Sequence, residues 1–164
     1  MSRRRRSYES GHKPKYLVVI DDSPECDRAI YYASRRVSRI GVGMIMLRVI
    51  DLEDRNQQWL GVADIMRAEA YEEANAALDR AASRANAIAA ITPERVIREG
   101  AWIEQILKLI DEDEDVAILI LAAGTASEEP GPLVSAIGRN AGEFPIPVAI
   151  VPGHLSDEEL DALS

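Results

Sequence analysis

Short stretches rich in apolar residues alternate along the chain with longer segments in which apolar residues recur every three or four positions. The short stretches predict strands at 15–21, 44–51, 94–99, 116–123 and 146–152. The longer segments predict helices from Pro24 to just before Gly41, over about 59–90, from Gly100 to about 110, and near 132–143. Strands that alternate with helices predict an α/β fold, with a parallel sheet, right-handed crossovers and helices on both faces.

The chain divides into a body and two short ends. Residues 1–14 are basic and polar, and they predict a disordered arm, whereas residues 15–152 hold the strands and the longer helices. Residues 153–164 form a tail in which Ser156 and Glu159 have the spacing of a capping box, so we expect a short final helix. The arm is interpreted either as a solvated tail or as a segment whose four arginines contact nucleic acid, anionic lipid or an acidic partner.

Composition narrows the class of protein. The formal net charge of −9 argues against a body that binds nucleic acid or anionic membranes. The longest apolar run is far shorter than the ~20 residues of a membrane-spanning helix, and no apolar segment follows the first arginines as in a secretory signal. We therefore expect a cytoplasmic protein with no membrane partner, and the single Cys26 fits a reducing compartment.

The sequence offers little for catalysis or for binding metal. The acidic run 111–115 lacks the glycine and the distal glutamate of a calcium loop and is interpreted as a solvated helix end. His12 and His154 fall in the arm and the tail, and Ser135 lacks the nucleophile-elbow sequence. We expect no metal site and no enzyme, although slow ATP hydrolysis stays open.

Two loops are expected to share one crevice. If the winding of the sheet reverses between the first and fourth strands, the loops "IDDSP" and "AAGTASEEPG" meet beyond the carboxyl ends of those strands. The acidic pair Asp21 and Asp22 resembles the start of a receiver domain, in which Asp51 would be the phosphoacceptor. Asp51, however, is too close to Asp21 to end a third strand, and no lysine follows Lys108, so this interpretation fails.

Another family matches these segments better and over nearly the whole chain. From Lys15 to Pro152 the chain resembles the universal stress protein family in "YLVVIDDSPECDRAIYYAS", "MIMLRVID", "VIREG", "DVAILILAAG" and "FPIPVAIVP". The resemblance implies an open five-stranded parallel sheet in the order 3-2-1-4-5, of the adenine nucleotide α-hydrolase-like type. It also implies a homodimer that pairs through the last strand, at Val148, Ala149, Ile150 and Val151.

The resemblance further implies a nucleotide site, which this sequence keeps only in part. Nucleotide-binding members carry a glycine, two residues, a glycine, nine residues, a glycine and then serine or threonine. They hold the nucleoside with an aspartate after the first strand and a position in the second. The matching positions here are Asp21, Val49, Gly124, Ser127, Val134 and Ser135.

Three departures weaken the phosphate part of that pattern. Ser127 and Val134 stand where the family has glycines, and a β-branched residue resists close approach of the backbone. Gly131 is a candidate replacement for a lost glycine. Glu128 and Glu129 add negative charge near the phosphates, which costs on the order of 1–4 kcal/mol for a contact at about 4 Å.

Three functions follow as hypotheses. The first is a non-enzymatic stress-response dimer with a degenerate phosphate loop and no cofactor, acting through an unidentified protein partner or a small ligand. The second is a regulatory protein that binds ATP or another adenine nucleotide through a remodelled loop. The third is association of the basic arm with nucleic acid. Whether the protein holds ATP separates the first two.

Overall fold

The computed structural model describes residues 4–51, 60–125 and 130–164. Its strands are β1 (Lys15–Val19), β2 (Gly43–Ile50), β3 (Glu94–Glu99), β4 (Val116–Ala123) and β5 (Val148–Pro152). Its helices are α1 (Cys26–Ile40), α2 (Leu60–Ala89), α3 (Trp102–Glu112), α4 (Pro132–Arg139) and α5 (Asp157–Leu163), with a short 3-10 helix, η1 (Ala141–Glu143), between α4 and β5.

The sheet has the predicted architecture. All four strand pairs are parallel, and the strand order is β3-β2-β1-β4-β5, which confirms the expected order 3-2-1-4-5. Val18 pairs with Met46 of β2 on one side and with Ile120 of β4 on the other. The charged strand β3 lies at one edge of the sheet, as its sequence predicts, and β5 lies at the other.

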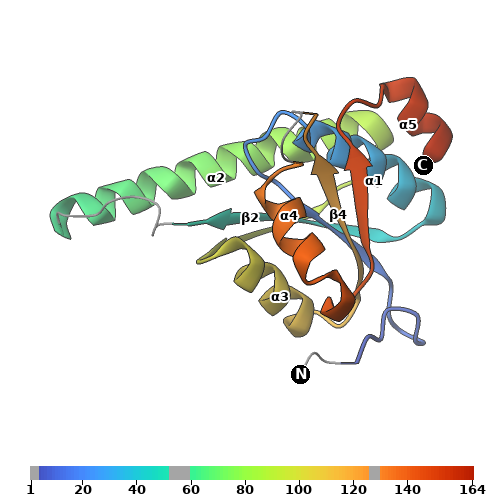
Figure 1. Ribbon diagram of the computed structural model, residues 1–164, viewed down its shortest axis with the longest axis horizontal. Helices are drawn as coiled ribbons and strands as arrows, with labels where there is room; N and C mark the ends of the chain where they lie inside the picture. The colour runs from blue at the N-terminus through green and yellow to red at the C-terminus, as the bar shows by residue number, and fades with distance from the viewer. Residues whose placement is uncertain (1–3, 52–59, 126–129) are drawn as a thin grey trace.

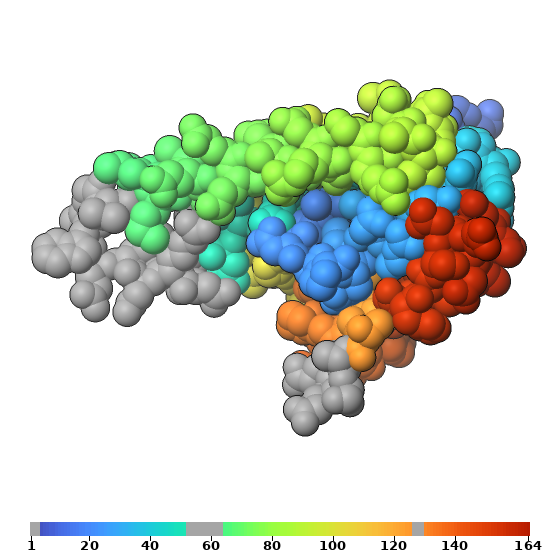
Figure 2. Space-filling view, turned by 90° about the horizontal axis from the view of Figure 1, so that it is seen from above, coloured from blue at the N-terminus to red at the C-terminus, as the bar shows by residue number. Residues whose placement is uncertain are grey.

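Helices cover both faces of the sheet (Figure 1). Val18 and Ile20 face a core shared with α1, α2 and α5, whereas Leu17 and Val19 face a core shared with α3 and α4. The alanine stripe of α2 is buried at Ala74, Ala81 and Ala85, and small side chains let this long helix lie close to its neighbours. Figure 2 shows α1 between α2 on one side and α5 on the other.

Several predicted boundaries are corrected. Helix α1 begins at Cys26 rather than at Pro24, and Ser23 does not cap it. The backbone N–H and hydroxyl of Ser23 both donate to the Asp21 carboxylate, and this local turn competes with a helix start. Strand β5 begins at Val148, two residues later than predicted. The capping box of α5 is present as predicted, whereas Trp59 lies outside the described residues.

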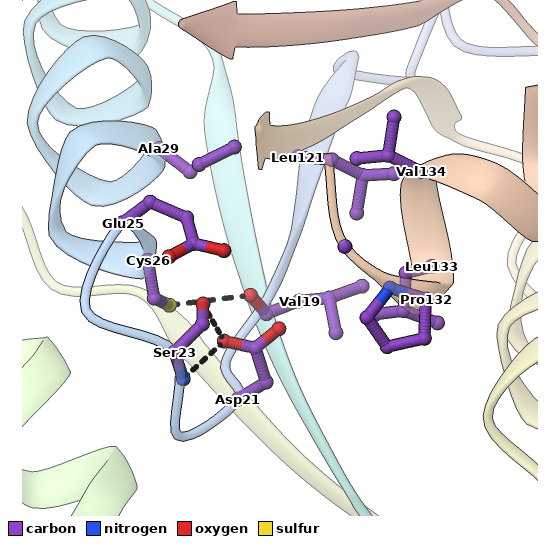
Figure 3. Close-up of a pocket in the computed structure, with 12 residues that line it drawn as sticks. Val19, Asp21, Ser23, Glu25, Cys26, Ala29, Leu121, Pro132, Leu133 and Val134 are labelled. Carbon is purple, nitrogen blue, oxygen red and sulfur yellow. Dashed lines mark hydrogen bonds between the residues drawn. The ribbon is translucent and has the colours of Figure 1, made fainter. Parts of the chain in front are cut away.

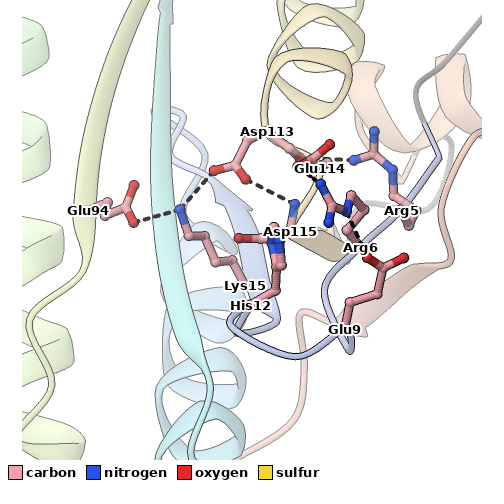
Figure 4. A network of polar contacts seen from close by, with 9 residues as sticks. All are labelled: Arg5, Arg6, Glu9, His12, Lys15, Glu94, Asp113, Glu114 and Asp115. Atoms are coloured by element: carbon pink, nitrogen blue, oxygen red, sulfur yellow. Dashed lines mark hydrogen bonds and ion pairs between the residues drawn. The ribbon is translucent and has the colours of Figure 1, made fainter.

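The structure places residues 4–14 differently from the predicted disordered arm. They lie along the acidic turn after α3, where the Arg6 N–H donates to the Glu114 carbonyl and His12 Nδ1 lies 2.6 Å from Asp115 (Figure 4). Lys15, where β1 begins, contacts both Asp113 and Glu94 at 2.9 Å. The reason for this placement is electrostatic, because basic side chains of residues 4–15 contact acidic side chains of residues 111–115. These acidic residues therefore do not form a purely solvated helix end.

Candidate functional site

The pairing of β1 with β4 brings two loops together at the carboxyl ends of the strands. The loop after β1 is shaped by Asp21, whose Oδ1 accepts hydrogen bonds from the Ser23 N–H at 3.0 Å and from the Ser23 hydroxyl. The loop after β4 closes where the Gly124 N–H donates to the Pro130 carbonyl at 2.8 Å. The predicted meeting of the two loops is therefore present.

A small cavity lies between these loops (Figure 3). It has a volume of about 40 Å³, far below the roughly 300 Å³ at which small-molecule pockets begin. Asp21 and Val134, two of the predicted nucleotide-binding residues, both line it. The rest of its wall comes from the apolar ends of β1 and β4, from the start of α1 and from residues 131–133.

The start of α4 offers few hydrogen-bond donors to an anion. Pro132, its first residue, has no N–H, and the Ser135 N–H already donates to the Gly131 carbonyl at 3.0 Å. Gly131, just before the helix, has φ 116° and ψ 155°, a backbone conformation available to glycine. Only the N–H groups of Leu133 and Val134 stay free of intrahelical bonds in this first turn.

Glu25 is a residue of this site that the sequence analysis missed. Its side chain points into the gap between α1 and the start of α4 (Figure 3). A β-carbon added to Gly124 would lie 3.1 Å from Glu25 Oε1. Glu25 precedes α1 as its N-cap residue, but its side chain makes no capping hydrogen bond. The feature of the sequence that could have identified Glu25 is its position in the loop after β1, which faces the glycines of the loop after β4.

Arg48 is a second residue that the sequence analysis missed. Its side chain is only 10% exposed, and its Nη2 lies 2.9 and 3.0 Å from the two carboxylate oxygens of Asp22. The same guanidinium donates to the Ile20 carbonyl at 3.2 Å. A buried arginine on β2 thus fixes the loop after β1. The two neighbouring aspartates have different partners: Asp22 contacts Arg48, and Asp21 accepts hydrogen bonds from Ser23.

The predicted residues do not all share one pocket. Val49, 3% exposed, lines a separate hollow of about 160 Å³ at the end of β2, together with Arg48 and Trp102. Ser135 lies within α4, and Gly124 lies against Glu25. Ser127, Glu128 and Glu129 lie outside the described residues.

A larger cleft opens on the other side of the loop after β1. It has a volume of about 380 Å³ and lies between this loop and α2. Its floor is apolar, with Ile30 and Ala81, and its rim carries Asp21, Arg80 and Arg84. Asp21 therefore borders both the small cavity and this cleft, whose volume is in the range of small-molecule sites.

Cys26 is buried where the loop enters α1. Its thiol donates to the Val19 carbonyl at 3.6 Å, and burial raises its pKa to about 12. A thiol with such a pKa is almost entirely protonated at neutral pH, and the thiolate is the form that reacts. Cys26 is thus packing rather than a nucleophile.

The described residues offer no grouping suited to metal binding or to a catalytic triad. Within 4–51, 60–125 and 130–164, no three His, Cys, Asp or Glu residues are placed to hold a metal ion. His12 contacts Asp115 beside the start of β4, whereas Ser135 lies in α4. No helix in the described part of the chain is long and apolar enough to cross a membrane.

Comparisons with known proteins agree with this architecture. The sequence profile of the universal stress protein family matches residues 14–152. The universal stress protein UspA from Lactobacillus plantarum has a similar structure, with a TM-score of 0.69, 19% identity, and coverage of 84% of this chain and 97% of that one. No curated protein matches the chain significantly.

Two further similar structures contain adenine nucleotides. A universal stress protein in complex with cAMP has a TM-score of 0.63 and 23% identity, over 84% of this chain and 96% of that one. The universal stress protein from Archaeoglobus fulgidus in complex with dAMP has a TM-score of 0.59 and 16% identity, over 84% of this chain and 96% of that one. At these identities the similarity establishes the fold.

The buried thiol gives a direct check of this part of the structure. Because burial raises the Cys26 pKa to about 12, roughly one thiol in 10,000 is ionised at pH 8. We expect the native protein to react with a disulfide reagent at least about 100-fold more slowly than the protein unfolded in guanidinium. Native and unfolded rates within a few-fold of each other would contradict the buried position.

Proposed function

Because the chain belongs to the universal stress protein family, we propose that it is a non-enzymatic stress-response protein whose phosphate loop no longer holds a nucleoside triphosphate. It acts through a protein partner or through a small ligand that lacks a triphosphate. The observation that carries the proposal is the 40 Å³ cavity left between Asp21 and Val134, where a triphosphate would need several times that volume.

Charge supports the same conclusion. A phosphate placed beside Gly124 would lie next to the Glu25 carboxylate, and a like-charge contact at about 4 Å costs on the order of 1–4 kcal/mol. The described residues that line the small cavity include no lysine or arginine to offset this cost. The cleft of about 380 Å³ on the other side of Asp21 offers a small ligand the space that the cavity lacks.

The second candidate function is regulation by a bound adenine nucleotide. It is favoured by the retained Asp21 and Gly124 and by the related proteins solved with cAMP and dAMP. A nucleoside monophosphate needs fewer contacts from the glycine loop than ATP does. The two candidate functions therefore differ in how the binding affinity depends on the number of phosphate groups in the nucleotide.

The arm is better explained by contacts within the chain than by nucleic-acid binding. Arg6 contacts Glu9 at 2.7 Å and Glu114 at 3.5 Å, and Arg5 donates to the Asp113 carbonyl at 2.9 Å. These contacts engage Arg5 and Arg6, two of the arginines that a nucleic acid would need. We therefore retain a protein partner or a small ligand as the proposed target.

Titration with ATP separates the two candidate functions. Calorimetry of the purified protein with ATP, with and without magnesium, is expected to give no saturable binding below millimolar nucleotide, because the cavity is too small and too acidic. Acid extraction of the purified protein is expected to release no adenine nucleotide. Micromolar ATP binding that Asp21→Ala abolishes would overturn the proposal in favour of the nucleotide-regulated candidate.

The proposed homodimer rests on the edge position of β5. Its outer edge presents unpaired backbone groups, and Ile150 is 44% exposed there, while Val148 and Ala149 are half-buried and Val151 is buried. Pairing with the same strand of a second copy would satisfy these groups and cover Ile150. The four residues predicted from the sequence, Val148 to Val151, all lie in this strand.

A charge on β5 tests that assembly. Ile150→Lys is expected to weaken dimerisation at least about tenfold in sedimentation velocity, because the interface would have to bury an unpaired ammonium group. Ile65→Lys is the matched control, since Ile65 is 61% exposed on α2, a helix that packs against α1 and β2. A wild-type protein that sediments as a monomer at micromolar concentration, or equal assembly of both variants, would rule out this dimer.

A further inference from the structure

Three glycines from two loops surround the side chain of Glu25. A β-carbon on Gly124 would lie 3.1 Å from Glu25 Oε1, and one on Gly131 would lie 3.8 Å from the same atom. One on Gly153, just after β5, would lie 3.1 Å from Glu25 Cβ and would also collide with the Ala123 carbonyl oxygen. The Glu25 carboxylate thus takes the space that Gly124 leaves open, and Gly131 lies within ordinary contact distance of the same oxygen.

This position is where a glycine loop and a following helix would receive a phosphate group. Glycines allow the backbone to approach the ligand, and the N-terminal end of a helix favours a negative charge. In this chain the same loop approaches a carboxylate that belongs to the protein itself. A carboxylate tethered to the chain is always present, so a phosphate must displace it or lie beside its charge.

Glu25 has no other described role that would account for its conformation. Its backbone carbonyl accepts a hydrogen bond from the Arg28 N–H, but its side chain makes no capping hydrogen bond, and its carboxylate has no hydrogen bond or ion pair with residues 4–51, 60–125 or 130–164. Its substitution therefore removes no described polar contact, and the folded state is expected to tolerate it. A residue that is dispensable for folding and fills a ligand position has its main effect on the ligand.

We propose that Glu25 is the specificity-determining residue of this site, because its carboxylate fills the phosphate position beside Gly124 and Gly131 and so excludes phosphorylated ligands. The proposal rests on the proposed function, in which the wild-type loop does not hold a triphosphate. It goes further by assigning the exclusion to one side chain, whose removal restores a site for the phosphate end of an adenine nucleotide.

Two substitutions separate the charge of Glu25 from its volume. Glu25→Gln removes the charge and keeps the size, whereas Glu25→Ser removes both. Equilibrium dialysis with ATP and magnesium, and with inorganic pyrophosphate, is expected to show affinity at least about tenfold above wild type for Glu25→Ser, with a smaller gain for Glu25→Gln. Adenosine affinity is expected to change less than twofold, which a general loosening of the structure would not produce.

Glu143→Gln is the matched control for net charge, because Glu143 is exposed in η1. It is expected to bind ATP and pyrophosphate as the wild type does, and thermal unfolding verifies that each variant is folded. If Glu25→Ser is not folded, Glu25→Gln and Glu25→Asp, which draws the carboxylate back by one methylene, still decide the question.

The outcomes separate this inference from the proposed function. Folded Glu25 variants that bind ATP and pyrophosphate no better than wild type overturn the role of Glu25, whatever the wild-type affinity is. Wild-type protein that already binds ATP at micromolar concentration overturns the proposed function. A further tenfold gain in the Glu25 variants would then still support Glu25 as the residue that limits phosphate binding.

Discussion

The pairing of β1 with β4 is the constraint on which the rest of the site depends. Each of the first four strands is followed by a crossover helix that covers a face of the sheet, and the ends of β1 and β4 are left side by side. The loop after β1 and the loop after β4 therefore face each other across a narrow gap. What lies in that gap is decided by a few side chains at the loop ends.

In this chain the gap is occupied by the protein's own groups. Glu25 lies against the glycines of one loop, Val134 adds its branched side chain from α4, and about 40 Å³ remains. In the loop after β1, Arg48 contacts the Asp22 carboxylate and donates to the Ile20 carbonyl, which holds the backbone there. The fold of the family is retained, and under our proposal the phosphate position is filled and the cleft beside α2 is left for a small ligand.

The fold could be predicted from the sequence, and the contacts that decide the site could not. Strand and helix periods are local, so the alternation, the edge strand β3 and the capping box of Ser156 were predictable. Ser23 was assigned to a helix cap because the competing bond to Asp21 depends on the actual turn. Glu25 and Arg48 were missed because their roles arise from segments far apart in sequence, as does the packing of His12 against Asp115.

In the proposed arrangement the chain's own carboxylate, rather than a phosphate, lies against Gly124 and Gly131. The most direct test is a crystal structure of the wild-type protein grown with millimolar ATP and magnesium. We expect electron density for the Glu25 carboxylate beside both glycines and no phosphate density in the gap. Phosphate density between the two loops, with the Glu25 side chain turned out to solvent, would contradict it.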